Sequence, residues 1–243
     1  MADMAERRRC ARGIWRAVLM AGSEAEERIR AKVEAELRRL YPDARIIHEL
    51  VLSTGVSRLD LAAVTPDALI VAEIKSERDS LSRLPAQIAM AHEIADVTWV
   101  VVAEKHRDAL AHHATYYSVG PERPRKPPLT GMWRETWQNP DYLPGLDRCV
   151  RLVETGDGFD KTQPGPWQQR VTDPRAVFDV LWAQERRDAI ARHGAPVSKS
   201  DTCAKTHAWA VENMTGAQIR REVCRALRLR SFARADPPME MAS

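Results

Sequence analysis

Cysteine is scarce in this sequence, and its spacing excludes two common kinds of small scaffold. The chain of 243 residues has four cysteines, at Cys10, Cys149, Cys203 and Cys224. No two of them form a C-x-x-C pair, so a structural zinc site built on that pair is not expected. Their wide separation also gives no sign of a disulfide framework, which indicates a reducing compartment.

Long apolar runs are absent as well. No stretch approaches the roughly 18 consecutive apolar residues that a membrane span needs. Near the start of the chain, Arg12 and Arg16 interrupt the apolar residues that could otherwise form the core of a signal peptide. We therefore expect a cytoplasmic protein that does not interact with a membrane.

The net charge is only +3, but the arginines are concentrated at the two ends of the chain. Five arginines lie in residues 7–16, and six more lie in residues 220–234. The arginine side chain can donate two parallel hydrogen bonds to a phosphate group, which lysine cannot do. Two interpretations stay open: a surface that binds phosphate groups, or arginine-rich helices that are simply soluble.

Hydrophobic patterning divides the chain into four parts. They are a basic N-terminal arm or helix at 1–22, an α/β core at 23–120, a connecting region rich in proline and glycine at 121–170, and a helical, arginine-rich region at 171–243. The three helices expected in the last part either form a small appended domain or cover the core.

Within the core, apolar residues recur at the spacing of helices and strands in turn. The expected order is a helix at 23–40, three strands at 44–53, 57–64 and 68–76, a helix at 79–95, a strand at 97–104, a short helix at about 105–114 and a strand at 115–119. Strands joined by hairpins and then by a helical crossover imply a mixed sheet flanked by helices.

Two acids and a lysine lie within the second and third of these strands. If Pro66-Asp67 is the tight connection, Asp60 lies directly across from Glu73, with their Cβ atoms roughly 5 Å apart. Lys75 follows Glu73 by two residues and so projects from the same face of the hairpin. The opposite face is expected to hold Leu59, Leu61, Ile70, Ala72 and Ile74.

Two opposed carboxylates in an apolar sheet repel each other, and a divalent cation between them removes the repulsion. Oxygen ligands without thiols or imidazoles favour Mg²⁺ or Mn²⁺. Such an ion eases deprotonation of a water, and Lys75 can orient that water or stabilise negative charge, which suits phosphodiester hydrolysis. The alternative is an ion network that only supports the hairpin, although buried ion pairs add little stability.

The pattern D-x12-E-I-K at Asp60, Glu73 and Lys75, between strands and followed by a helix, resembles the PD-(D/E)XK nuclease superfamily. Leu59 stands where the name of that superfamily has proline. Residues 73–87, EIKSERDSLSRLPAQ, resemble a narrower group of small bacterial and phage nuclease-like proteins. The resemblance implies a restriction-endonuclease-like core of helix, three-stranded antiparallel meander, helix and strand over residues 23–120.

The resemblance also implies roles for single residues. Asp60 and Glu73 would be metal ligands, and Lys75 the catalytic lysine. Gln87 matches a glutamine that in some branches orients the site or contacts DNA, although it could equally be an exposed helix residue. Members often add a further acidic ligand, and the candidates, for each of which a solvated surface position is the alternative, are Glu27, Glu34 and Glu49.

Several residues are candidates for nucleic-acid binding. Ser80 and Arg83 lie near the start of the helix after Lys75, where they could hold a phosphate or simply cap the helix. Arg58 could contact the strand or pair with an acid. In the last helix an apolar stripe at Ile219, Val223 and Leu227 is accompanied by arginines that suit a phosphate backbone, namely Arg221, Arg225 and Arg228.

Together these observations predict a nuclease, a hydrolase of the endonuclease kind, that depends on Mg²⁺ or Mn²⁺ and acts on DNA in repair, recombination or phage DNA metabolism. The main alternative is a catalytically silent nucleic-acid-binding protein with the same fold. A structural protein with an ion network in its hairpin is a third reading. The sequence leaves open whether two copies pair as a homodimer.

Overall fold

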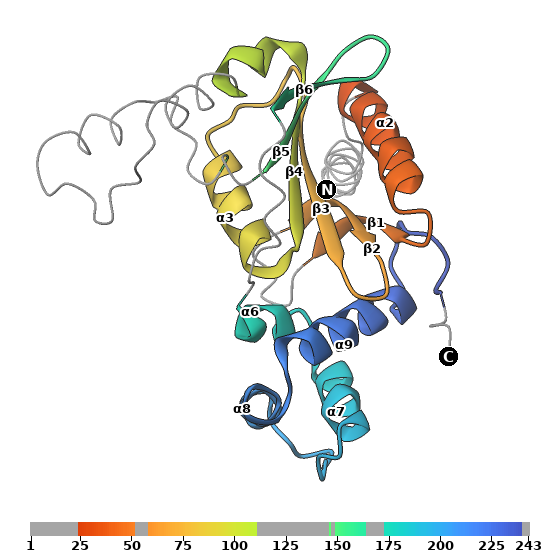
Figure 1. Ribbon diagram of the computed structural model, residues 1–243, viewed down its shortest axis with the longest axis vertical. Helices are drawn as coiled ribbons and strands as arrows, with labels where there is room; N and C mark the ends of the chain where they lie inside the picture. The colour runs from red at the N-terminus through yellow and green to blue at the C-terminus, as the bar shows by residue number, and fades with distance from the viewer. Residues whose placement is uncertain (1–23, 52–57, 111–145, 147–148, 164–172, 240–243) are drawn as a thin grey trace, which may run out of the picture.

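The structure is a computed structural model that describes residues 24–51, 58–110, 146, 149–163 and 173–239. Its centre is a six-stranded mixed β-sheet with helices on both faces (Figure 1). The expected α/β fold with a mixed sheet is therefore confirmed. The basic arm at 1–22 and the strand predicted at 115–119 lie outside the described residues.

The first four elements match the predicted order closely. They are helix α2 (Glu24–Leu40) and strands β1 (Arg45–Val51), β2 (Arg58–Val64) and β3 (Leu69–Lys75). The three strands pair antiparallel in sequence order. Helix α2 buries Ile29, Val33 and Leu37, whose spacing places them on one helix face.

Two parallel strands extend the sheet from β3. Helix α3 (Leu84–Ile94) crosses over to β4 (Val97–Val102), which is parallel to β3. After the short helix η1 (Glu104–His106), β5 (Val150–Glu154) adds in parallel and β6 (Phe159–Gln163) pairs antiparallel at the edge. Strands β5 and β6 come from the predicted connecting region, so the sheet continues beyond residue 120.

Helix α3 begins later than the pattern predicted, at Leu84 rather than near residue 79. The carboxylate of Asp79 accepts hydrogen bonds from the backbone N–H and the hydroxyl of Ser76, at 2.7 and 2.6 Å. Asp79 thus stabilises the turn after β3 instead of capping the helix. Pro85 lies in the first turn of α3, where the missing N–H costs no helical hydrogen bond.

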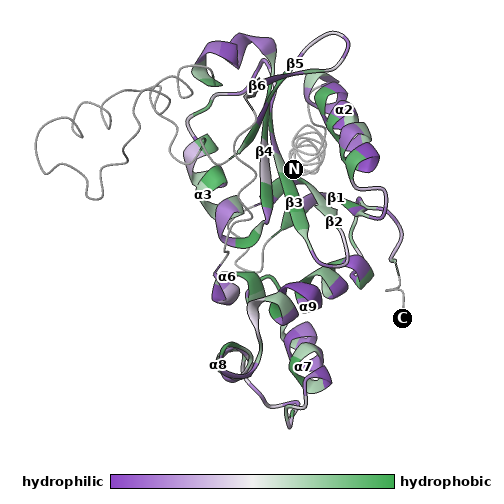
Figure 2. Ribbon diagram, in the orientation of Figure 1, coloured by the Kyte–Doolittle hydropathy of each residue, from purple (hydrophilic) through white to green (hydrophobic). Residues whose placement is uncertain are grey.

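The two faces of the sheet are covered by different helices. Helix α2 covers one face, where it packs on Leu61, Ile70, Ala72 and Ile74, as expected for that side of the hairpin. Leu59 was expected there too, but it packs in the core on the other side. Figure 2 shows hydrophobic residues along the strands β2 and β3 and hydrophilic residues on the outer side of α2.

The C-terminal helices share the core of the sheet rather than forming a separate one. They are α6 (Pro174–Phe178), α7 (Ala183–Arg192), α8 (Cys203–Asn213) and α9 (Gly216–Leu229). Phe178, Val223 and Leu227 are fully buried in one cluster with Val64 and Val71 of the sheet. Helix α9 packs on β2, whereas α7 and α8 lie below the sheet and pack against each other, with α8 also against α6 (Figure 1). No helix in the described part of the chain is long and apolar enough to span a membrane.

The C-terminal end of α9 is held by a buried arginine on the first strand. Arg45, which is 1% exposed, donates five hydrogen bonds of 2.7–2.9 Å to the backbone carbonyls of Leu227, Arg228, Arg230 and Asp236. Carbonyls in the last turn of a helix lack intrahelical partners, and a cation there also meets the negative end of the helix dipole. Arg45 therefore fixes α9 to the sheet.

The chain then returns along the outer edge of β1. The backbone N–H of His48 donates to the carbonyl of Arg234 at 2.9 Å, and the N–H of Asp236 donates to the carbonyl of Ile46 at 3.0 Å. Ile47 and Ala235 form the β-bridge between them. A short C-terminal segment, residues 234–236, thereby pairs with β1.

Arg228 corrects one prediction made from the sequence. It is 4% exposed, and its guanidinium donates to the backbone carbonyls of Asp43 and Val64 at 2.7 and 2.9 Å. Arg228 therefore does not belong to an exposed, phosphate-binding face, because its long side chain turns inward to satisfy buried carbonyls. Arg221 is exposed and Arg225 is half-buried, so these two stay available at the surface.

Replacing Arg45 by methionine should lower the free energy of unfolding by about 3 kcal/mol, because several buried carbonyls lose a charged donor. Urea unfolding followed by circular dichroism measures the change. Arg39→Met is the matched control, since Arg39 lies exposed on α2 and its loss should leave the stability nearly unchanged. Equal stability of the two variants would contradict this view of α9.

Candidate active site

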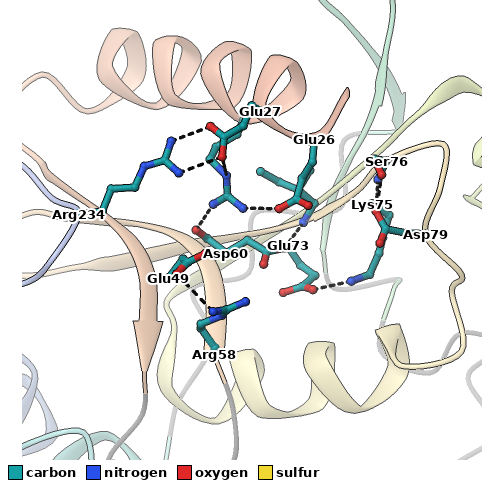
Figure 3. Close-up of polar contacts among 12 residues, drawn as sticks. Glu26, Glu27, Glu49, Arg58, Asp60, Glu73, Lys75, Ser76, Asp79 and Arg234 are labelled. Atoms are coloured by element: carbon teal, nitrogen blue, oxygen red, sulfur yellow. Dashed lines mark hydrogen bonds and ion pairs between the residues drawn. The ribbon is translucent and has the colours of Figure 1, made fainter. Parts of the chain in front are cut away.

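The three charged residues of the hairpin come together as the turn predicted. Strands β2 and β3 pair Leu61 with Ala72 and Val64 with Leu69, so the predicted register is confirmed. Asp60 and Glu73 are the next residues beyond the last pair. Glu73 and Lys75 are 2% and 5% exposed, and Asp60 is half-buried. Figure 3 shows the Lys75 amine directed at the Glu73 carboxyl group.

The carboxylate of Asp60, rather than the backbone of β2, accepts a hydrogen bond from β3 at this point. Its Oδ2 accepts a hydrogen bond from the backbone N–H of Ile74 at 2.9 Å. This contact holds the Asp60 side chain beside the Glu73 side chain, where the two groups interact electrostatically. The site thus contains two acids that cannot both ionise without a compensating charge.

The two oxygens of Glu73 have different surroundings. Oε1 accepts hydrogen bonds from the amine of Lys75, at 2.7 Å, and from the side-chain amide of Gln87 on α3. Oε2 is buried and has no hydrogen-bond partner among the described residues, and the same holds for Oε1 of Gln87. A buried acceptor without a donor is costly, so a further positively charged or donating group is expected at the site.

Burial and the negative charge of Asp60 raise the pKa of Glu73 to about 8, although Lys75 acts in the opposite direction. The burial contribution is the largest, because an ionised carboxylate loses its hydration inside the sheet. Without a cation, the protonated form of Glu73 is therefore favoured more strongly than in an exposed glutamate. A positive charge placed next to it would favour the ionised form.

The oxygens of this site suit a divalent cation of the Mg²⁺ or Mn²⁺ type. Asp60 and Glu73 supply hard carboxylate oxygens, and the unpartnered Oε2 of Glu73 is a ready ligand. In the described part of the chain no group of three or more His, Cys, Asp or Glu residues could enclose a metal. Two carboxylates with water in the other positions is a common arrangement for Mg²⁺.

The further acidic candidates are each engaged with a basic side chain. Glu27 accepts two hydrogen bonds from Arg234, at 2.9 and 2.7 Å. Glu34 binds Arg38 at 2.8 Å, and its other oxygen lies 3.3 Å from a ring nitrogen of His48. The structure does not place either glutamate as a ligand of the Asp60–Glu73 pair.

Glu49 and Arg58 form an exposed ion pair, with 3.3 Å between the guanidinium and the carboxylate. Arg58 therefore pairs with an acid, which was one of the two roles considered for it. Glu49 has a φ of 55°, a left-handed backbone conformation that residues other than glycine seldom adopt. This backbone distortion lies on β1 beside Asp60.

The candidate phosphate-binding residues lie between β3 and α3. Ser80 is exposed, and its hydroxyl lies 2.9 Å from that of Ser82. Arg83 is also exposed and occupies the N-cap position of α3, with no hydrogen bond from its side chain to the helix. Neither residue contacts the acids of the site, and their part in binding nucleic acid stays a prediction.

Sequence reasoning missed two residues of α2 that reach the site. Arg30 is 2% exposed and donates to the backbone carbonyl of Asp60 at 2.5 Å and to the carboxylate of Glu26 at 2.6 Å. The sequence offers only the four-residue spacing of Glu26 and Arg30, which is typical of many surface ion pairs on helices. Nothing in that spacing shows that Arg30 turns inward.

Parts of this chain are similar to a known protein family and to a solved structure. A model of the family described as "Bacteriophage P4 protein cII" matches residues 20–119, which include all the residues of the site. No curated protein matches the chain significantly. A solved structure titled "SPO1766 protein of unknown function from Silicibacter pomeroyi" is similar over 74% of this chain and 100% of its own, with 13% identity and a TM-score of 0.38.

The raised pKa of Glu73 predicts how stability depends on pH in the absence of metal. Between pH 4.5, the ordinary pKa of a glutamate, and about pH 8, the folded protein binds more protons at Glu73 than the unfolded chain. The contribution of Glu73 to stability is therefore fully present below this range and is lost as the pH rises through it. His48 and His106, whose pKa values burial lowers, contribute in the opposite direction, so urea unfolding in EDTA at several pH values should compare the wild type with a variant at Glu73.

In Glu73→Gln this contribution should be absent, because the amide does not titrate, so the stability of the wild type should fall relative to that of the variant as the pH rises. Glu104→Gln is the control, since Glu104 is exposed and the Arg107 guanidinium lowers its pKa. Its profile should run parallel to that of the wild type. A difference between the wild type and Glu73→Gln that stays constant between pH 5 and pH 8 would contradict the assignment.

Proposed function

We propose that this chain is a metal-dependent nuclease with a PD-(D/E)XK-type core, and that it hydrolyses phosphodiester bonds in DNA. The observation that carries the proposal is the buried Glu73 carboxyl group, which has one oxygen without a partner among the described residues, beside Asp60 and within 2.7 Å of the Lys75 amine. The order α2, β1–β3, α3, β4 agrees with a restriction-endonuclease-like core.

In this proposal Asp60 and Glu73 hold Mg²⁺ or Mn²⁺. The bound cation would offset the charge of the two acids and of the phosphoryl oxygens, and make a water easier to deprotonate. The Lys75 amine, already fixed beside Glu73, orients the attacking water and stabilises negative charge that develops on the phosphate. Gln87 orients Glu73 by donating its amide N–H to Oε1.

The alternative of a purely structural ion network fits the site less well. A network that serves only stability would satisfy both oxygens of its buried carboxylate, because each unpaired acceptor costs about 1–3 kcal/mol. Here Oε2 of Glu73 and Oε1 of Gln87 are both unpartnered within the part of the chain that the structure describes. The loss of stability from these two unpaired acceptors is explained if both oxygens bind a ligand.

DNA as the substrate rests on the resemblance to nucleases and on exposed basic residues. Arg221 and Arg225 of α9, together with Ser80 and Arg83 before α3, are at least partly exposed and could contact phosphates. The family description names a bacteriophage protein, which agrees with the phage part of this expectation alone. A cytoplasmic location and pairing of two copies stay predictions from the sequence.

Cleavage of linear, circular, single-stranded and branched DNA tests the nuclease proposal. The wild type should cut at least one substrate with Mn²⁺ or Mg²⁺ and none with EDTA. Lys75→Ala, Glu73→Gln and Asp60→Asn should each lower the rate at least about 100-fold, since each removes a group that acts in the transition state.

Lys161→Ala is the matched control, because Lys161 is exposed on β6 away from the acids, and it should retain full activity. Cutting that persists equally in Lys75→Ala and in EDTA would not come from this site. If a folded wild type cuts none of the substrates, the proposal that this protein is a nuclease is wrong.

The second candidate is a catalytically silent protein that binds nucleic acid. Glu27 and Glu34 are bound to arginines, so among the described residues only Asp60 and Glu73 are acids of the site. A site with two acids favours this second candidate. Such a protein would bind DNA without needing Mg²⁺ at Asp60 and Glu73. Calorimetry with Mn²⁺ separates the two functions, because the nuclease requires binding that Glu73→Gln weakens.

Both candidates predict that Arg221 and Arg225 contact phosphates. The double variant Arg221→Ser/Arg225→Ser should weaken DNA binding and reduce the slope of log K against log salt concentration by about 2, one for each lost contact. Arg39→Ser/Arg107→Ser is the control, since each of these arginines is already paired with a carboxylate. An unchanged slope in the first variant would place the DNA elsewhere.

A further inference from the structure

The regular pairing of β2 with both neighbouring strands is interrupted at Asp60. Between β1 and β2, His48 pairs with Leu61 and Leu50 pairs with Leu59, but the pair Glu49–Asp60 is missing from the register. The left-handed backbone of Glu49 lies at this point. Between β2 and β3, the pairing ends at Leu61–Ala72, one residue before Asp60.

Side-chain hydrogen bonds replace the lost strand pairing of Asp60. The carboxylate accepts from the Ile74 backbone N–H at 2.9 Å. The Asp60 carbonyl accepts from the Arg30 guanidinium at 2.5 Å. Asp60 is therefore fixed at two points, by its own carboxylate toward β3 and by Arg30 toward α2.

Burying the charged side chain of Arg30 to make this contact costs free energy of folding. Its side chain is 2% exposed, and its Nε atom has no hydrogen-bond partner among the described residues. Of the acids that the structure describes, Glu26 lies within hydrogen-bonding distance, at 2.6 Å, while the carboxylate of Glu27 is 3.7 Å from Nε. Replacing a buried pair such as Arg30–Glu26 as a whole by apolar residues of similar volume is often neutral for stability, so stability alone does not explain the pair.

We propose that Arg30 is a positioning residue, which holds the backbone of Asp60 so that its carboxylate stays beside Glu73. Glu26 orients the guanidinium by its hydrogen bond to Nη2, while Nη1 reaches the Asp60 carbonyl. Helix α2 thus contributes to the site through the series Glu26, Arg30 and Asp60, rather than by supplying a metal ligand. This inference rests on the proposed function only where it concerns the cation.

The planar guanidinium is essential to this role. Arginine donates in two fixed directions at once, whereas a lysine amine offers a single charged centre on a flexible chain. A lysine in this position could therefore satisfy either Glu26 or the Asp60 carbonyl, but would not hold both in the same geometry. The conservative substitution Arg30→Lys should consequently impair the site while keeping the charge.

Two measurements test the proposal, and the first needs no metal. Amide hydrogen exchange of Ile74 reports on its bond to Asp60, with the amide of Val71, in the middle of β3, as an internal reference for global opening. In Arg30→Met the Ile74 amide should exchange about 10-fold faster relative to Val71, which corresponds to one lost hydrogen bond. Arg28→Met, an exposed neighbour on α2, should leave the ratio unchanged.

The second measurement is Mn²⁺ binding by calorimetry. Arg30→Met should bind Mn²⁺ about 10–100-fold more weakly than the wild type, the usual effect of removing a group that orients a ligand. Arg30→Lys and Glu26→Gln should show smaller losses in the same direction. These two milder variants also serve if Arg30→Met does not fold.

The outcomes separate this inference from the proposed function. If the wild type binds no Mn²⁺, the nuclease proposal fails, while the Ile74 exchange still decides the role of Arg30. If the folded Arg30 variants keep the wild-type ratio of Ile74 to Val71 exchange, the positioning role is overturned. If Arg30→Lys keeps both the wild-type exchange ratio and the wild-type Mn²⁺ affinity, a guanidinium is not required at this position.

Discussion

The buried carboxyl group of Glu73 is the constraint around which the site is built. A carboxylate at 2% exposure is tolerated only if neighbouring groups offset the loss of hydration, and here Lys75 and Gln87 both bind its Oε1 atom. The second oxygen remains without a partner among the described residues. Strand β3 positions Glu73 and Lys75, α3 supplies Gln87, and α2 holds the strand that carries Asp60, so three elements converge on one carboxyl group.

Much of this arrangement could be predicted from local patterns. The turn at Pro66-Asp67 fixes the register of β2 and β3, and the alternation of side chains then places Asp60, Glu73 and Lys75 together. The order of helices and strands follows from apolar periodicity in the same way. These features depend on residues that are close in sequence, which explains why they are visible without a structure.

The arginines could not be assigned in this way. Arg30, Arg45 and Arg228 look like surface residues in the sequence, yet each is buried and donates to backbone carbonyls far along the chain. A long side chain lets the charged group cross to a distant partner, and the identity of that partner is set by tertiary packing. Strands β5 and β6 are likewise not evident in the sequence, because β5 has only a short apolar run, β6 has one apolar residue, and both lie in a region rich in proline and glycine.

The pairing of residues 234–236 with β1 also affects how the protein meets its neighbours. An open strand edge offers unpaired N–H and carbonyl groups to any extended chain, and this is a common origin of unwanted aggregation. The chain covers part of that edge with its own C-terminal segment, and Arg234 ties the segment to Glu27 on α2. The fold thus shields the side of the sheet nearest the candidate site against foreign strands by means of a segment that truncation before residue 234 would remove.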